Sequence, residues 1–408
     1  MAYPVITVEI AFSSDPLATV PLYEDMTRYV RSIPLIRRGR QNALTTIEAG
    51  EAVVVLDNRL RTFDPTYAGS GPFLIPMRKI RISATYAATT YYLFTGYVES
   101  WSPTWEASNK NSEVTIHCVD AFKFFNQTTL STSLPAENVK FALNTLMDTL
   151  SWPSSDRAIL DGQTFVKALT VTNKNALQHI QDLMLAENGL FFMDTQGRTA
   201  FQGRQYRLTN STSTTAQATF GDGGGSELPY QSLEPAYDDT QIYNDIHVTA
   251  DAGTEQISLD PTSINNYFKR SLVRTGLLYG DASSSGGNTP ENEAAGMAQW
   301  LLFNLKQPGL RFDSMTLEGG YSDNLWPQML AREISDRITV KHRPPPSGST
   351  VISKDVWVEA VEHRITDITA TYLRWQTTWQ LSEANTAAWW ILDSTTYSVL
   401  DSTTIPAF

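Results

Sequence analysis

The chain has 408 residues, of which 41% are hydrophobic and 18% charged, and its formal net charge is -12. Such a composition is typical of a folded chain of roughly one to three domains and excludes an intrinsically disordered one. The acidic balance argues against tight nucleic-acid binding, because a protein that holds DNA or RNA firmly neutralises phosphates with Lys and Arg.

The single cysteine, Cys118, excludes a disulfide within the chain and gives no support for a cysteine-rich zinc site. Residues 1–10 have neither the basic start nor the long apolar core of a signal peptide. No stretch reaches the ~18 uncharged apolar residues that a membrane-spanning helix needs. We therefore expect a chain that folds in a reducing cytoplasm and has no membrane segment.

The N-terminal third is predicted to be β. Residues 3–12 alternate side chains as a half-buried strand does, and a connection with three prolines follows over 13–34. After a basic turn at 36–40 come four runs rich in β-branched and aromatic residues, which predict strands of one antiparallel sheet or barrel ending near Phe125. These four runs are 52–56, 78–82, 92–101 and 114–121.

The next segment is predicted to be a small α+β module. Residues 136–150 follow Pro135 with apolar residues at helical spacing, and residues 175–188 repeat that spacing before a left-handed stop at Asn188-Gly189. Two apolar runs, 190–193 and 199–202, then flank the turn sequence Asp194-Thr195-Gln196-Gly197, which predicts a hairpin.

Residues 209–235 are rich in Ser, Thr and Gly and predict a flexible loop or domain boundary. A strand is expected at 242–248 and a second loop at 280–288. Thr289 as N-cap and Pro290 at the first helical position then predict a helix over 290–306.

The C-terminal part is predicted to be β again, with strands at 337–340, 356–361 and 373–381. It contains an echo of the N-terminal part. Val98-Glu99 precedes Asp120-Ala121 by 21 positions, and Val361-Glu362 precedes Glu383-Ala384 by the same number. Duplication of one β-barrel and coincidence both remain open at this point.

Several residues were weighed as candidates for chemistry, and none forms a catalytic set. His117 and Cys118 are neighbours in a strand, so their side chains point to opposite faces and cannot form a nucleophile–base pair. The five histidines lack metal-ligand spacing. Glu359 and His363 share a strand face while Glu362 points away, and a surface cluster is the expected arrangement of these three.

The remaining polar clusters are also expected to be structural. Asp222-Gly223-Gly224-Gly225 lacks the Lys and Ser/Thr of a phosphate loop, and Asp238-Asp239 is expected to be solvated. Arg37, Arg38 and Arg40 form the one cationic cluster, which in so acidic a chain is expected to pair with carboxylates rather than nucleic acid. The glycosylation sequons at Asn126 and Asn210 carry no meaning without a secretory route. We therefore predict no catalytic, cofactor or metal site, and no enzyme activity.

Read whole, the chain resembles the minor tail proteins of long-tailed bacteriophages, the tail-tip or baseplate hub family. The resembling pattern in the N-terminal part is Arg38-Gly39-Arg40, Leu44, Ile47, Gly50, Ala52, Leu56-Asp57-Asn58, Phe63-Asp64-Pro65, residues 94–99, Trp101, Trp105 and Asp120-Ala121-Phe122. Later parts of the pattern are residues 186–189, Phe192, Asp194, Gly197, Phe201, Trp326, residues 335–340, Trp375, residues 379–382, residues 390–394 and residues 398–400. The motifs are individually loose, but their order and spacing cover nearly the full chain.

This resemblance implies a mainly β fold with α+β insertions: two tube-type β-barrel domains plus smaller helical and hairpin modules. The implied domains are a first barrel over 1–126, an α+β module over 127–208, a flexible boundary over 209–235, a second barrel over 236–384 and a C-terminal extension over 385–408. Because the last residue follows the second barrel closely, we expect no appended peptidase, lysozyme or receptor-binding module.

The resemblance also implies a function. Members of the family form a trimer whose six barrels continue the sixfold tail tube to a threefold tip, without turnover or cofactor. The expected partners are two further copies, the distal tail protein ring, the tape measure protein and the tip or fibre proteins. DNA would pass through an acidic bore without specific binding, and the protein would reside at the virion tail tip after assembly in the host bacterial cytoplasm.

Two other functions compete with this hub. Exposed Trp and Tyr residues would suit a module that binds cell-wall glycan or a surface receptor, although most of these aromatics occupy strand positions expected to be core. A peptidoglycan hydrolase is the third alternative. Sedimentation combined with a glycan pull-down separates the hub from the glycan-binding module, and zymography tests for the hydrolase.

Overall fold

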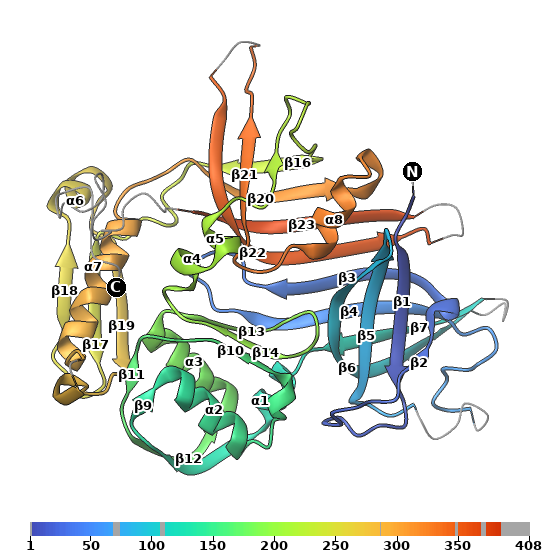
Figure 1. Ribbon diagram of the computed structural model, residues 1–408, viewed down its shortest axis with the longest axis horizontal. Coiled ribbons are helices and arrows are strands. Elements are labelled where there is room, and N and C mark those ends of the chain that lie inside the picture. Colours follow the sequence, from blue (N-terminus) through green and yellow to red (C-terminus); the bar gives the residue numbers. More distant parts are fainter. Residues whose placement is uncertain are drawn as a thin grey trace.

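The chain forms one large, mainly antiparallel β-sheet to which two smaller mixed modules are attached (Figure 1). The computed structural model describes residues 2–67, 74–106, 111–285, 287–346, 350–368 and 373–384. The predicted mainly β fold with helical and hairpin insertions is confirmed. The domain boundaries stay predictions, and the C-terminal extension at 385–408 lies outside the described residues.

The first half of the large sheet contains seven strands. They are β1 (Val5–Ala11), β2 (Glu24–Asp25), β3 (Val30–Gly39), β4 (Glu48–Asp57), β5 (Arg78–Tyr86), β6 (Thr89–Trp105) and β7 (Ser112–Val119). Their order in space is β3-β4-β7-β6-β5-β1-β2. The alternation predicted for β7 is confirmed, since Val114, Ile116 and Cys118 are buried. The basic turn expected at 36–40 is wrong, because residues 36–39 continue strand β3.

The second half contains six strands. They are β15 (Thr219–Phe220), β16 (Ser232–Ala236), β20 (Arg311–Glu318), β21 (Arg337–His342), β22 (Ile352–Thr366) and β23 (Arg374–Glu383). The stretch 209–235 was expected to be a flexible loop or a domain boundary; the loop is wrong, because the stretch supplies β15 and most of β16 to the sheet, and the boundary stays a prediction. The Ser, Thr and Gly content is typical of a loop, but strands distant in sequence provide the hydrogen bonds that hold β15 and β16 in the sheet.

The two halves have the same strand order. With the two-residue strand β2 set aside, the first half runs β1-β5-β6-β7-β4-β3 across the sheet and the second runs β15-β21-β22-β23-β20-β16, so each position is taken by the strand of the same rank along the chain. One pair differs in direction, because β15 is parallel to β21 whereas β1 is antiparallel to β5. This repetition favours duplication over coincidence.

The halves are joined edge to edge through β3 and β22, which pair antiparallel. The hydrogen-bonded strand path of the described residues therefore continues from one half into the other, and it stays open at β2 and β16. Thus the two predicted barrels form one continuous sheet, and no ring of hydrogen bonds closes around either half within the described residues.

The structure aligns the two halves differently from the sequence echo. A β-bulge follows Val98 in β6 and another follows Val358 in β22, each where the strand pairs with the next strand of its half. The counterpart of Val98-Glu99 is therefore Val358-Glu359 and not Val361-Glu362.

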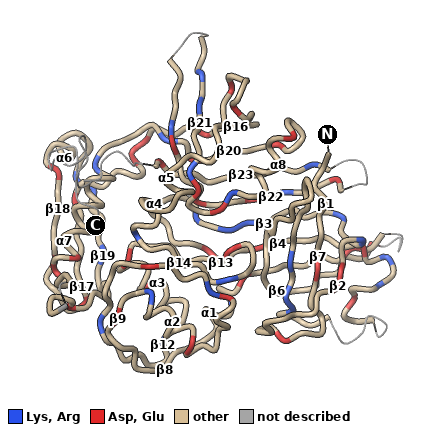
Figure 2. Tube along the Cα trace, viewed as in Figure 1, with Lys and Arg blue, Asp and Glu red and all other residues tan. Residues whose placement is uncertain are grey.

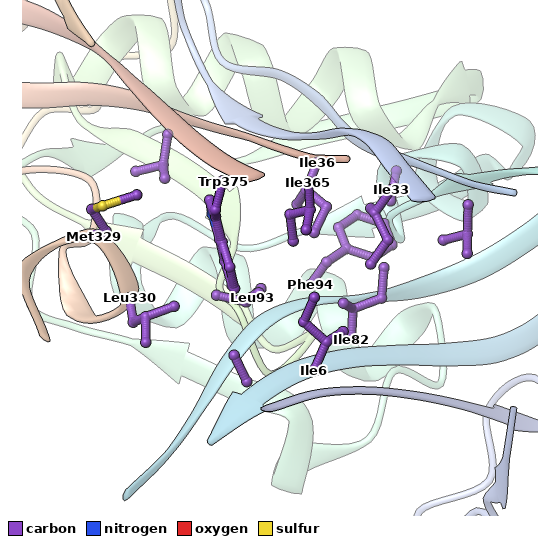
Figure 3. Close-up of a cluster of buried hydrophobic side chains, with 14 of the residues drawn as sticks. Ile6, Ile33, Ile36, Ile82, Leu93, Phe94, Met329, Leu330, Ile365 and Trp375 are labelled. Carbon is purple, nitrogen blue, oxygen red and sulfur yellow. The ribbon is translucent and has the colours of Figure 1, made fainter. Parts of the chain in front are cut away.

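A single hydrophobic core lies between the two halves of the sheet. Figure 3 draws part of it, in which Ile6, Ile82 and Phe94 of the first half lie in one cluster with Ile365 and Trp375 of the second. The side chains of these residues are almost completely buried. The halves therefore share their core and are not two separately packed units.

The first module lies below the sheet in Figure 1 and packs helices on short strands. It contains α1 (Phe122–Gln127), β8 (Thr129–Leu134), β9 (Glu137–Asn138), α2 (Val139–Thr149), β10 (Arg157–Ile159), β11 (Phe165–Val166), β12 (Leu169–Asn175), α3 (Ala176–Glu187), β13 (Leu190–Met193) and β14 (Thr199–Gln202). Both predicted helices and the hairpin are confirmed. Asn138 and Asn175 cap the helices, and Asn188 ends α3 with a left-handed φ of 54°.

The second module, at the left of Figure 1, is a three-stranded sheet covered on one face by a helix. It contains β17 (Asp245–Ala250), β18 (Gln256–Leu259), α6 (Pro261–Tyr267), β19 (Ser271–Leu277) and α7 (Pro290–Leu305). The predicted N-cap is confirmed, because Thr289 Oγ1 accepts a hydrogen bond from the Asn292 amide at 3.3 Å. Three further short helices are α4 (Tyr206–Thr209), α5 (Ser211–Thr214) and α8 (Leu325–Ala331).

Candidate functional site

A buried polar cluster lies where the two halves of the sheet meet near the first module. Its centre is Glu359, a fully buried carboxylate in β22. Arg40 Nε donates to it at 2.7 Å, and the two terminal nitrogens of Arg207 donate at 2.6 and 2.9 Å. The Ser382 hydroxyl of β23 donates as well. We call Glu359, Arg40, Arg207 and Ser382 the arginine junction.

Electrostatics hold the Glu359 side chain in its charged form. Burial alone raises the pKa of a carboxyl, but the guanidinium groups of Arg207 and Arg40 outweigh it and hold the pKa of Glu359 well below its usual range. The same burial lowers the pKa of Arg40, which Glu359 opposes. The junction is a fixed ionic contact between elements, because its carboxylate is not free to exchange a proton near neutral pH.

The β-bulge explains why the sequence placed these residues wrongly. Glu359 is the extra residue of the bulge, so side-chain parity changes along β22. His363 then points into the core, where its Nδ1 lies 2.9 Å from Thr377 Oγ1 and 3.2 Å from Trp375 Nε1. The expected surface cluster of Glu359, Glu362 and His363 is therefore wrong, because Glu359 and His363 are buried.

Gly39 allows β3 to reach the bulge. Its φ is +116°, and a Cβ there would lie 2.3 Å from the Glu359 carbonyl oxygen. The two backbones do approach closely at this point, because the Arg40 amide, which follows Gly39, donates a hydrogen bond to the same Glu359 oxygen at 3.0 Å. Only glycine fits both the backbone conformation and the space.

The prediction that the arginine cluster pairs with carboxylates is confirmed. Arg37 lies 3.3 Å from Glu48, Arg38 lies 3.0 Å from Glu333, and Arg40 binds Glu359. Arg38 is almost fully buried and also donates to the Met193 carbonyl at 3.2 Å, which ties β3 to the hairpin of the first module.

A second buried carboxylate holds the two modules together. Glu187 at the end of α3 accepts backbone hydrogen bonds from Gln163, Thr164 and Arg204 at 2.7 to 3.1 Å. The Arg204 side chain reaches Glu293 of α7 at 3.0 Å. The contact links the second module to the first.

Beside the arginine junction lies a cavity of about 340 Å³. Its walls come from all three parts of the molecule: the 40–47 loop and the end of β23 from the sheet, α3 from the first module, and α7 from the second. The apolar lining includes the half-buried side chains Leu177, Met184, Leu185, Trp300 and Leu305. Five arginines, at 40, 204, 207, 274 and 311, also line it.

Of the other candidate residues, His117, Cys118 and Asp222 lie outside the cavity lining, whereas Asp238 is part of it. Cys118 is buried and His117 exposed, as predicted for neighbours in a strand, and burial raises the pKa of the Cys118 thiol. Asp222 accepts from Arg343 at 2.9 Å, so the glycine-rich turn is tied to the end of β21. Asp238 and Asp239 stay partly exposed as expected, but they pair with Arg311 and Arg270.

Arg207, Arg204 and Arg274 were not predicted, because each lies in a segment without a motif, and Glu187 entered only through the resembling pattern at 186–189, without a role. In the part of the chain that the structure describes, no group of three His, Cys, Asp or Glu side chains is arranged to hold a metal ion. None of the described helices is long and apolar enough to cross a membrane.

No protein-family model matches the chain, and no curated protein matches it either. Solved structures do. A tail protein from Neisseria meningitidis MC58 superposes with a TM-score of 0.61 at 11% identity, covering 93% of this chain and 96% of that one. The 43 kDa tail protein of prophage MuSo2 from Shewanella oneidensis gives a TM-score of 0.54 at 12% identity, covering 94% and 98%. The predicted resemblance to tail proteins is thus confirmed at the level of the fold.

Proposed function

We propose that this protein is a structural, non-enzymatic component of a phage-type tail tip, and that three copies form a ring that adapts a sixfold tube to a threefold tip. The observation that carries the proposal is the repeated strand order of the two halves and their edge-to-edge junction through β3 and β22. Two equivalent units per chain give six around the axis of a trimer, which matches the symmetry of a tube.

The pairing of β3 with β22 has an equivalent place elsewhere in the sheet, where the strand edges are unpaired among the described residues. Beyond its bulge, β22 pairs on one side with β23 and on the other with β3. The equivalent part of β6, residues 100–105, pairs with β7 alone among the described residues. Strand β16, the counterpart of β3, likewise pairs only with β20 in the described residues.

Joining β6 of one copy to β16 of the next would repeat the internal junction between chains. Such a contact is heterologous, so three copies close a ring if the rotation between neighbours is a third of a full turn, and the open edges on β6 and β16 are then paired. Trp105, at the end of β6, has 61% of its surface exposed in the single chain. An exposed aromatic at a strand edge suits a buried interface.

The oligomeric state tests this proposal directly. Light scattering and analytical ultracentrifugation of the full chain should give three times the 45.5 kDa monomer mass. Electron microscopy of the particles should show threefold symmetry with a central hole. A chain that stays monomeric at tens of micromolar would overturn the proposal unless a tube protein restores the ring.

Passage of DNA is the finer part of the proposal. Figure 2 shows basic and acidic residues interspersed over the sheet, and the net charge of -12 supports a bore without strong affinity for a polyanion. The proposed neighbours are the distal tail ring, the tape measure protein and tip or fibre proteins. Fluorescence anisotropy should detect no binding of duplex DNA at physiological salt, and an electropositive bore in the assembled ring would contradict the idea.

A further inference from the structure

The cavity beside the arginine junction has features of a binding site that the ring does not use. Two helices, α3 and α7, present half-buried apolar side chains toward it, among them Leu177, Met184 and Leu305. A volume of about 340 Å³ lies within the range of pockets that hold small ligands or large side chains. Water against such walls is unfavourable, so an apolar occupant would stabilise the fold.

Arg274 gives the cavity an unmatched charge. The other four lining arginines have carboxylate partners: Arg40 and Arg207 bind Glu359, Arg204 binds Glu293, and Arg311 binds Asp238. The Arg274 side chain, on β19, makes no hydrogen bond or ion pair with any described residue and is half-buried. Burial and the nearby charge of Arg40 lower the pKa of its guanidinium, and Tyr279 opposes them. A carboxylate in the cavity would relieve both costs.

The chain itself supplies a segment of matching chemistry at the right place. Leu381, Ser382 and Glu383, the last residues of β23, line the cavity, so the chain leaves the described structure at its rim. Shortly afterwards the sequence reads Trp389-Trp390-Ile391-Leu392-Asp393. These are four large apolar residues followed directly by an acid.

We propose that residues 389–393 dock in this cavity of their own chain, with the apolar side chains against α3 and α7 and the Asp393 carboxylate on Arg274. The reach is sufficient, because an extended chain covers ~3.3–3.6 Å per residue and Trp389 follows Ala384 by only five residues. The short tether gives the segment a high effective concentration at the site, so modest contacts are enough to hold it. The docked segment would fix the sheet to both modules without any second copy.

Photo-cross-linking tests the location. The full-length chain would carry p-benzoyl-L-phenylalanine in place of Trp390, and a mixture of isotope-labelled and unlabelled protein would distinguish links within a chain from links between chains. We expect within-chain links to peptides of α3 and α7. Links between chains, links to peptides elsewhere or the absence of links would overturn the proposal. The same probe at exposed Phe141 should not label the cavity peptides.

Charge exchange tests the ion pair. Arg274→Asp or Asp393→Arg alone should lower the docked fraction, measured as cross-link yield, with roughly a fivefold loss in the docking equilibrium. The double exchange should restore most of it. Asp393→Asn keeps the test valid if Arg274→Asp unfolds, because residue 393 lies outside the described fold. Equal yields in all variants would overturn the role of Arg274. The docking concerns contacts within one chain, and the proposed ring concerns contacts between chains. A negative cross-linking result would therefore overturn the docking without affecting the ring.

Discussion

At the scale of single residues, the buried carboxylate Glu359 shows how charge is used in this fold. Removing a carboxylate from water is costly, and two arginines and a serine compensate it. Each partner belongs to a different segment, since Arg40 follows β3, Arg207 lies in α4 and Ser382 in β23. One side chain therefore fixes the relative positions of three elements.

Glu359→Gln should destabilise the protein by about 3–5 kcal/mol, because it leaves two guanidinium groups buried without a counter-charge. Urea unfolding at pH 7 measures the loss. The matched control is Glu362→Gln three residues along the same strand, where Glu362 pairs with the exposed Arg364 and the expected change is within ~0.5 kcal/mol. Equal losses of unfolding free energy in the two variants would show that the arginine junction contributes no more to stability than an exposed ion pair does.

Asp120 should make stability fall as the pH rises. Burial raises the pKa of this carboxyl to about 7, although backbone hydrogen bonds from Phe122 and Gly50 and the charge of Arg38 act in the other direction. A carboxyl whose folded pKa lies above its unfolded value stabilises fully at low pH and loses that contribution as the pH rises toward the folded pKa.

Between pH 5 and 7 the unfolding free energy of the natural chain should therefore decrease relative to Asp120→Asn, on the order of 1 kcal/mol per pH unit. The asparagine variant should be less stable at pH 5, because an asparagine side chain has one acceptor oxygen and can accept only one of the two hydrogen bonds that the Gly50 and Phe122 amides donate. Urea titrations of both proteins at several pH values measure the slopes. Parallel slopes would mean that Asp120 titrates normally.

For single residues, the sequence predicted the chemical type of a side chain's partner better than it predicted where the side chain lies in the fold. The acidic composition was enough to predict carboxylate partners for Arg37, Arg38 and Arg40. It could not place Glu359, because a bulge reverses side-chain parity and leaves no mark in the local pattern. Arg274 was missed for a similar reason, since its setting depends on three segments distant in sequence.

At the scale of elements, predictions were accurate where a local signal decides the structure. Thr289 as N-cap predicted the start of α7, and alternating apolar residues predicted strands such as β1 and β7. The stretch 209–235 was mispredicted because β15 and β16 gain their order from β21 and β20, and not from their own composition. Short strands at the edge of a sheet carry little sequence signal of their own.

Gly39→Ala should weaken the pairing of β3 with β22. The new Cβ would overlap the Glu359 carbonyl and the Ala360 backbone, and alanine is strained at a φ of +116°. We expect a loss of roughly 2–5 kcal/mol in urea unfolding, with faster amide exchange along β3. Gly320→Ala is the control, because nothing lies within 4 Å of its added Cβ. An unchanged Gly39 variant would mean that the backbone can shift without cost.

At the scale of the whole molecule, the repetition of six strands explains why the sheet stays open. The internal junction of β3 with β22 satisfies one edge of each half, and the equivalent edges on β6 and β16, unpaired among the described residues, are those that the proposed ring would join. The sequence left duplication and coincidence open, since the Val-Glu echo paired residues that are not equivalent, and it could not reveal that the halves share one core. That sharing makes the orientation of the two repeats rigid, which a closed ring requires.

Trp105→Lys should prevent assembly of the proposed ring. Trp105 lies seven residues after Val98 in β6, as Ile365 lies seven after Val358 in β22, and Ile365 pairs with Ile33 in the internal junction. A lysine there would place a charge at the strand edge and remove an exposed aromatic, so association should weaken at least ~10-fold. Sedimentation velocity over a range of concentrations measures this, and thermal unfolding checks that the single chain stays folded. Phe141→Lys on α2, another exposed aromatic at 58%, should leave assembly unchanged. If the Trp105 variant assembles as well as the natural chain, the ring is not built through β6.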